Sequence, residues 1–209
     1  MTQRIWERIE QARERWDVLR HPFYRRWSAG ELSREELARY SGQYRHAVRA
    51  IATLSQAAAD AAPERPELRR HAVEERDHVA LWDDFVESAG GCAADAPTPE
   101  TEDCVRAWSG SAAVHDGRDE LLARLVRLYA IESGQPEISG IKRQGLVDLY
   151  GFIEGPGTAY FSLHERRDTE HAAEVRELIE ELAEQGDEDE LAAGAEAVLR
   201  ANWRLLDGV

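Results

Sequence analysis

The chain has 209 residues, of which 43% are hydrophobic and 32% charged, an ordinary composition for a soluble globular protein. This length fits a single domain, spanning residues 1–209, with a sizeable core. The net charge of −15 argues against nucleic acid or an anionic membrane surface as a partner. No apolar run reaches the length of a membrane span, and the acid-containing N-terminus resembles neither a signal nor a transit peptide. We therefore expect a cytoplasmic protein that does not contact a membrane.

Every periodic segment of the sequence has the helical period. A first short helix around Ile5 and Ile9 ends near Pro22. Ser33 followed by Glu36 has the spacing of a capping box, which predicts the start of a longer helix. No segment alternates with period two for long enough to predict a strand, so we expect an all-α bundle of about seven helices. The later predicted helices cover residues 68–86, a short stretch near 105–108, 119–133, 138–150, 160–182 and 188–206.

Three ionisable residues interrupt the inward face of the helix predicted over 160–182. His164, Asp168 and His171 stand at i, i+4 and i+7, which is one face of an α-helix. Apolar residues continue the same stripe. Burying an acid and two imidazoles without partners is costly, so something must compensate them. A divalent metal would do so, and the alternatives are a solvated polar stripe or a set of hydrogen-bonded core histidines.

Two other predicted helices carry the same kind of interruption. Glu132 lies at the end of the inward stripe of the helix over 119–133. In the helix over 68–86, Glu75 and His78 have the Glu-x-x-His spacing with which one helix presents two ligands to a dinuclear centre. Glu74 is one residue away and is an alternative to Glu75. His71 shares the face, but we interpret it as a surplus core or rim histidine.

Together these residues predict a dinuclear metal site in the middle of the bundle. Oxygen and nitrogen ligands without thiolate suit iron or manganese better than structural zinc. A site with open positions binds dioxygen, which makes an oxidase or oxygenase the natural reaction class. One predicted arrangement places Glu74 or Glu75, His78 and His164 on one ion, and Glu132, Asp168 and His171 on the other.

Three stretches of the chain resemble a known family, the heme-oxygenase-like dimetal oxidases. They are HPFYRRWSAGELSREELARY at 21–40, YAIESGQPEISGIKRQGL at 129–146 and AYFSLHERRDTEH at 159–171. The resemblance runs from about Trp6 to Leu206, and the His-x3-Asp-x2-His motif is its most specific part. It implies the fold shared by the TenA- and PqqC-type enzymes, two iron or manganese ions, dioxygen, an external reductant and a homodimer.

The resemblance also implies roles for particular residues. The members of the family that this chain resembles most make p-aminobenzoate for folate synthesis from their own side chains, in a single turnover. By this resemblance Tyr24 supplies the ring, Lys142 supplies the amino group, and Tyr40 and Tyr160 lie close to the centre. Glu132, His164, Asp168 and His171 match the family's ligands without a gap. The helix of Glu74 to His78 departs from the family pattern, which commonly separates the glutamate and the histidine by a longer insert.

The residues themselves leave several alternatives open. Tyr24 lies in an aromatic cluster typical of core packing, and Lys142 lies in a polar helix where an exposed lysine is the ordinary expectation. A conventional oxygenase of the same fold would act on an external amine, amino acid or fatty acid. A TenA-like hydrolase needs a nucleophilic cysteine in the core, for which Cys92 and Cys104 are poorly placed. A protein-interaction module would need no inward His/Asp/His stripe.

Overall fold

The computed structural model describes residues 3–109, 117–182 and 188–209. These residues form helices and turns and contain no β-strand, which confirms the predicted all-α class. The helices are α1 (Gln3–Arg15), α2 (Pro22–Ala29), α3 (Arg34–Ala61), α4 (Pro66–Ala89), α5 (Pro99–Ser109), α6 (Gly117–Glu132), α7 (Gln135–Leu149), α8 (Pro156–Leu182) and α9 (Glu188–Leu205). Two short 3-10 turns, η1 (Val18–Arg20) and η2 (Leu206–Gly208), complete the list.

Local sequence signals set several of these boundaries. Ser33 and Glu36 form the predicted capping box, in which each side chain binds the other residue's backbone N–H at the start of α3. Gly90 ends α4 in the left-handed conformation, with φ of 74°, which glycine adopts without strain. Pro136 is in the first turn of α7 rather than in the break before it. This is the helix position where a proline loses no hydrogen bond.

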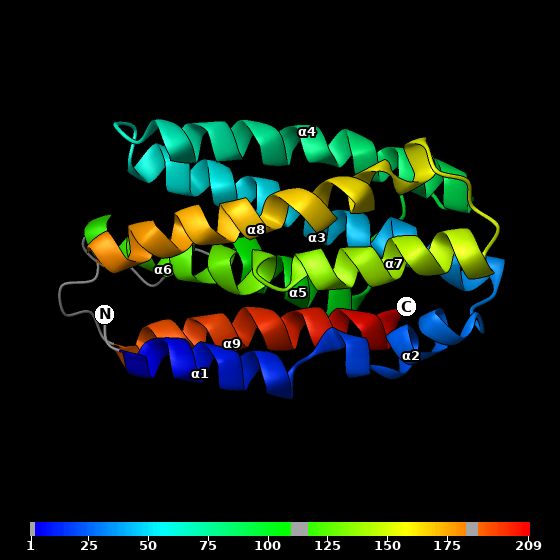
Figure 1. The fold of residues 1–209 in the computed structure, drawn as a ribbon, viewed down its shortest axis with the longest axis horizontal. Coiled ribbons are helices and arrows are strands. Elements are labelled where there is room, and N and C mark those ends of the chain that lie inside the picture. The colour runs from blue at the N-terminus through cyan, green and yellow to red at the C-terminus, as the bar shows by residue number, and fades with distance from the viewer. Residues whose placement is uncertain (1–2, 110–116, 183–187) are drawn as a thin grey trace.

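The long helices run side by side along the bundle (Figure 1). Helices α3 and α4 form an antiparallel hairpin, and α8 packs on α4 along one side. On its other side α8 packs on α6 and α7, which follow one another along the bundle. Helices α9 and α1 lie below this layer in the view, and α5 packs on α3 and α9. The arrangement places α4, α6 and α8, the three helices with polar residues on their inward faces, around one region of the core.

Within the described ranges, none of the helices combines the length and the apolar character needed to cross a membrane.

Candidate metal centre

The inward faces of α4 and α8 carry the same motif in opposite directions. His71, Glu75 and His78 in α4 repeat the spacing of the motif in α8, a histidine, an acid four residues later and a histidine three residues after that. Because the two helices are antiparallel, the motifs pair end to end. The ring centroids of His71 and His171 are 4.5 Å apart, and those of His78 and His164 are 4.6 Å apart.

Glu75 lies between two groups of side chains that have metal-ligand geometry. One ligand atom from each of His71, Glu75 and His171 lies within 4.8 Å of the others. The same holds for Glu75, His78 and His164. All five residues are buried. A carboxylate shared by two such groups is positioned to bridge two ions.

Two further carboxylates, those of Glu132 and Asp168, lie beside the first group. Oε1 of Glu132 is 2.9 Å from Nε2 of His71, and Oδ1 of Asp168 is 3.9 Å from Nδ1 of His171. Both acids are nearly inaccessible to solvent. Burial and the nearby charges of Glu132 and Glu75 hold the pKa of Asp168 well above its usual range. The centre therefore concentrates negative charge that only a cation or a proton can offset.

The histidines respond to this charge in different ways. Burial alone would lower the pKa of His71, but the adjacent Glu132 carboxylate, with Glu75 and Glu74 behind it, raises that pKa to about 9. Burial dominates at His164 and lowers its pKa to about 4. For Glu75, burial would raise the pKa, and the histidines around it lower it below the usual range. The acids and imidazoles of the centre are thus close enough to shift one another's pKa values.

Hydrogen bonds on the outer side of two imidazoles orient their inner nitrogens. Nδ1 of His164 donates to the carbonyl oxygen of Tyr160 at 2.7 Å, so Nε2 faces the centre without a proton. Nε2 of His171 is 2.8 Å from Oε2 of Glu74, which leaves Nδ1 facing the centre. Arg167 in turn binds both oxygens of Glu74, at 3.0 and 3.1 Å. Such outer partners fix the tautomer of a metal-ligating histidine.

The inner atoms of the cluster make no well-oriented hydrogen bond within the described residues, although Nε2 of His71 is 2.9 Å from Oε1 of Glu132 and Nδ1 of His78 is 2.9 Å from Oε1 of Glu75. Buried polar atoms are normally paired, because leaving them unpaired costs free energy. A concentration of unpaired nitrogen and oxygen atoms at one point fits metal ions better than solvent or packing. The atoms are His71 Nε2, His78 Nδ1, Glu132 Oε1 and Oε2, His164 Nε2, Asp168 Oδ1 and Oδ2, and His171 Nδ1.

The structure answers two questions that the sequence left open. Glu75 faces the cluster, whereas Glu74 points to Arg167 and to the outer nitrogen of His171. His71, which we had interpreted as surplus, lies within the cluster and contacts Glu132. The matching spacing of the two motifs was the sequence signal for His71.

A second buried site, about Lys142, lies next to the first in the same core. Lys142 is 1% exposed, so the expectation of an exposed lysine was wrong. Its Nζ lies 5.3 Å from the ring centroid of Tyr24, 5.7 Å from that of Tyr40 and 4.7 Å from that of Tyr44. Trp82 and Phe161 complete this aromatic chamber. Burial in it lowers the pKa of Lys142 to about 7, so that much of the amine is neutral near neutral pH.

The backbone around Lys142 is held by close packing on α2. Nε1 of Trp27 donates to the carbonyl oxygen of Lys142 at 3.3 Å. Gly145 makes this approach possible, because a Cβ there would lie 2.6 Å from Nε1 of Trp27. The hydroxyls of Tyr24 and Tyr40 are hydrogen-bonded at 2.7 Å, and burial raises the pKa of both far above the usual tyrosine value. Both phenols are therefore neutral.

Aromatic rings connect the chamber with the metal-type cluster. Tyr40 contacts Trp82, with ring centroids 6.1 Å apart, and Trp82 contacts Tyr160 at 4.8 Å. The ring of Tyr160 stacks on the imidazole of His164 at 3.9 Å. Of the tyrosines predicted to lie near the centre, Tyr160 adjoins it directly, whereas Tyr40 is next to Tyr24 instead.

Comparison with known proteins gives the family. A family model described as "iron-containing redox enzyme" matches residues 71–203, which include α6, α8 and most of α4. The chain belongs to this family. It is therefore an enzyme with oxidoreductase chemistry, as the sequence predicted.

Proteins named 4-aminobenzoate synthase are similar to almost the whole chain. The protein from Chlamydia muridarum is 30% identical over 197 residues, which cover 91% of this chain and 83% of that protein. The protein from Nitrosomonas europaea is 30% identical over 214 residues, covering 92% of this chain and 85% of that protein. The predicted resemblance to a family that includes p-aminobenzoate-forming enzymes is thus confirmed.

Solved structures confirm the heme-oxygenase-like fold. A domain of unknown function with that fold from Shewanella denitrificans OS217 superimposes with a TM-score of 0.79, at 21% identity, over 95% of this chain and 88% of that one. A TenA homologue from P. horikoshii OT3 gives 0.72 at 15% identity, over 97% and 95%. At these identities the likeness concerns the fold alone.

Proposed function

We propose that this chain is a self-sacrificing 4-aminobenzoate synthase, which supplies folate synthesis and uses Tyr24 as the ring donor and Lys142 as the amino donor. The proposed cofactor is a pair of iron or manganese ions held by His71, Glu75, His78, Glu132, His164, Asp168 and His171. Dioxygen is the oxidant, an external reductant completes the electron balance, and the active form is a homodimer.

The observation that carries this proposal is the chamber in which Tyr24 and Lys142 meet. A lysine amine with 1% exposure and a lowered pKa, within 5.3 Å of a buried tyrosine ring, has no evident structural purpose. Burial of a lysine without a carboxylate partner is costly. The named activity of the relatives joins an aromatic ring to an amine, and this pair provides both.

The product's structure dictates which bonds must change. 4-Aminobenzoate contains the tyrosine ring, a carboxylate at the position of Cβ, and nitrogen in place of the phenol oxygen. The Cα–Cβ bond of Tyr24 must therefore break: Cα takes up a hydrogen, which leaves a glycine residue in the chain, and dioxygen oxidises Cβ to the carboxylate. Nζ of Lys142 must leave Cε, which becomes an aldehyde, and the phenol oxygen departs as water.

The residues of this chain prepare that reaction in three ways. Metal ions at the centre would activate dioxygen, while the chain itself excludes water from the phenols and the amine. Burial keeps Lys142 partly neutral and therefore nucleophilic. Tyr40 hydrogen-bonds the phenol of Tyr24, and the rings of Tyr40, Trp82 and Tyr160 provide closely spaced steps for electrons between Tyr24 and the centre.

Mass spectrometry of the intact chain tests the proposal. The purified protein is loaded with iron or manganese, reduced, exposed to air and then digested for peptide mapping. We expect a peptide in which Tyr24 has lost its hydroxybenzyl group, in an amount equal to the 4-aminobenzoate formed. An unmodified chain that converts an added amine, amino acid or fatty acid over many turnovers would instead identify a conventional oxygenase.

The pH dependence of product formation follows from Lys142. Because its pKa is lowered to about 7, the neutral amine is the minor form below that pH and the major form above it. The titratable groups facing it are Tyr24, Tyr40 and Tyr44, whose raised pKa values keep them neutral throughout this range. We expect the single-turnover rate to rise about tenfold per pH unit below pH 7 and to level off above it.

The same lysine contributes to the pH dependence of stability, which provides an independent measurement. Its pKa is lower in the folded than in the unfolded chain, so the unfolded chain binds more protons between about pH 7 and the ordinary lysine value. The contribution of Lys142 to stability therefore increases as pH rises through this window. Lys142→Met should remove that slope from urea unfolding curves, and it should also abolish product formation.

Glu74 should control metal affinity without itself being a ligand. Glu74→Gln removes the charge that holds Nε2 of His171, and loss of such a partner typically weakens metal binding by roughly ten- to a hundredfold. Competition with a chelator measures the change. Glu174→Gln is the matched control, because Glu174 forms a similar bidentate pair with Arg70 between α8 and α4. An equal loss in both variants would mean that only the packing of the two helices had been weakened.

A further inference from the structure

A product formed from Tyr24 and Lys142 needs a way out of the protein. Both residues are 1% exposed, and Tyr40 beside them is completely buried. The proposed reaction releases a free aromatic molecule into this closed chamber. Some neighbouring space must therefore receive it, and its location can be inferred from the cavities of the bundle.

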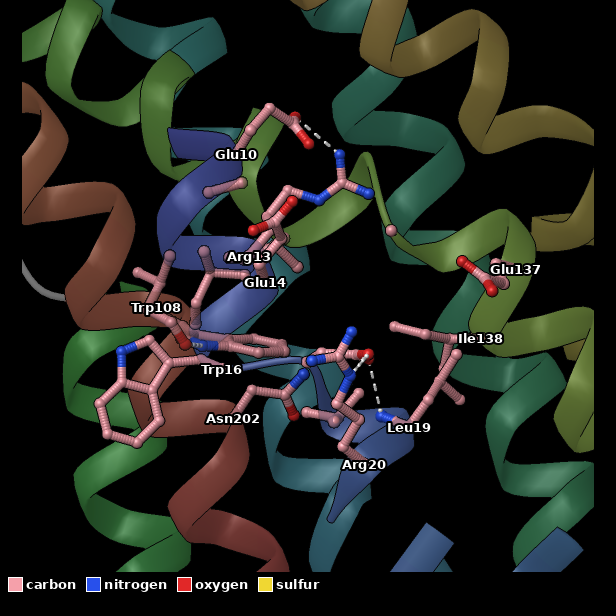
Figure 2. Close-up of a pocket in the computed structure, with 17 residues that line it drawn as sticks. Glu10, Arg13, Glu14, Trp16, Leu19, Arg20, Trp108, Glu137, Ile138 and Asn202 are labelled. Atoms are coloured by element: carbon pink, nitrogen blue, oxygen red, sulfur yellow. Dashed lines mark hydrogen bonds and ion pairs between the residues drawn. The ribbon is translucent and has the colours of Figure 1, made fainter. Parts of the chain in front are cut away.

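A cavity of about 180 Å³ lies between α1, η1, α5, α9 and the junction of α6 with α7. Figure 2 shows the Arg13–Glu10 pair above Trp16 in this cavity and Asn202 below it. The cavity is larger than the cavities of ~150 Å³ that accept benzene in protein cores. It is large enough for a single aromatic ring.

The inner wall of this cavity is one side chain away from the Lys142 amine. Asn202 lines the cavity, and its side chain adjoins the hydroxyl of Tyr44, as does that of Gln135. The same Tyr44 ring also borders the chamber, because its centroid lies 4.7 Å from Nζ of Lys142. Tyr44 is therefore the side chain that stands between the chamber and the cavity.

The lining of the cavity includes a hydrogen-bond acceptor, aromatic walls and two guanidinium groups. Asn202 is 8% exposed, and its Oδ1 has no hydrogen-bond partner within the described chain. This oxygen can therefore accept a hydrogen bond from a ligand in the cavity. Trp16, Trp108, Ile131 and Val198 supply apolar and aromatic walls. Arg13 and Arg20 also line the cavity, and their side chains are 29% and 66% exposed.

We propose that this cavity is the release site for the product, and that it binds a planar aromatic amine that carries a carboxylate. The amine donates to Oδ1 of Asn202, the ring packs against the tryptophans, and the carboxylate faces Arg13 and Arg20. This assignment rests on the proposed function for the identity of the ligand. Glu10 and Asp17 already pair with these arginines, and Glu14 and Glu137 add further negative charge. The site therefore binds an anion weakly, which favours its release.

Binding of added 4-aminobenzoate tests the site without any turnover. We expect the unreacted chain to bind it, with tryptophan fluorescence and calorimetry as readouts, and to bind benzoate about tenfold more weakly because benzoate leaves Oδ1 of Asn202 unpaired. Leu199→Trp fills the cavity from a half-buried position on α9 and should abolish binding. Leu149→Trp is the control, since Leu149 is 48% exposed and lines a separate surface depression beside α2.

Product release gives the second arm of the test. After one turnover, product in the filtrate of the native protein is compared with product freed by denaturation. Leu199→Trp should form as much product as the unaltered chain but retain most of it until denaturation, whereas Leu149→Trp should release it normally. Absence of 4-aminobenzoate binding to the unaltered chain, or product trapped by Leu149→Trp instead, would overturn the assignment. If Tyr24 is never consumed, the proposed function is refuted. The binding of added 4-aminobenzoate still shows whether the cavity takes this ligand.

Discussion

Tyr24→Phe should abolish 4-aminobenzoate formation and leave metal binding intact. Phenylalanine keeps the ring contacts with Phe23, Trp27 and Tyr40 but lacks the oxygen through which the ring is oxidised. The loss should be complete, because a side chain that becomes the product cannot be replaced by a neighbour. Liquid chromatography of the product after one turnover measures it, and metal content checks the centre.

A matched substitution separates chemistry from packing. Tyr129 is also buried and also has an aromatic partner, Trp6, with ring centroids 5.0 Å apart. It lies outside the Lys142 chamber, so Tyr129→Phe should leave product formation unchanged. Ring-labelled tyrosine incorporated into the chain should appear in the product of the unaltered protein. Unlabelled product, or full activity of Tyr24→Phe, would refute the assignment of Tyr24.

The metal-type cluster was largely predictable from sequence because helical spacing fixes which side chains share a face. His164, Asp168 and His171 project from one face of α8, and Glu132 ends the inward stripe of α6, as predicted. Spacing alone could not decide between Glu74 and Glu75. They are adjacent residues, and the choice depends on how α4 is rotated against α8. The matching motifs of α4 and α8 indicate this rotation, but only when the two helices are known to pack antiparallel.

The Lys142 chamber was much harder to predict, because its parts come from five separate helices. Tyr24, Tyr40, Trp82, Lys142 and Phe161 belong to α2, α3, α4, α7 and α8. Nothing in the local pattern of α7 distinguishes a lysine that faces rings from one that faces water. Only the family resemblance pointed to Lys142. The burial that makes its amine reactive is a property of tertiary packing.

If the proposed pair of ions is bound as inferred above, Glu75→Gln should remove the ability of the site to hold both of them. Glu75 is the one residue that both ligand groups share among those identified in the described residues, so its substitution weakens both positions together. A neutral amide keeps the shape of the side chain but withdraws a negative charge and one bridging oxygen. We expect bound iron or manganese to fall to a small fraction of that in the unaltered chain, together with the rise in thermal stability that added metal produces.

Two comparisons make this last expectation specific. Glu87→Gln, at an exposed position near the end of the same helix, should keep full metal content. His78→Ala removes a ligand from only one of the two groups, so it should lower the stoichiometry by about half rather than eliminate binding. Normal metal content in Glu75→Gln would mean that the carboxylate does not bridge. The carboxylate of Glu75 lies among four imidazoles, two from α4 and two from α8. This is the position that a carboxylate shared by two ions requires.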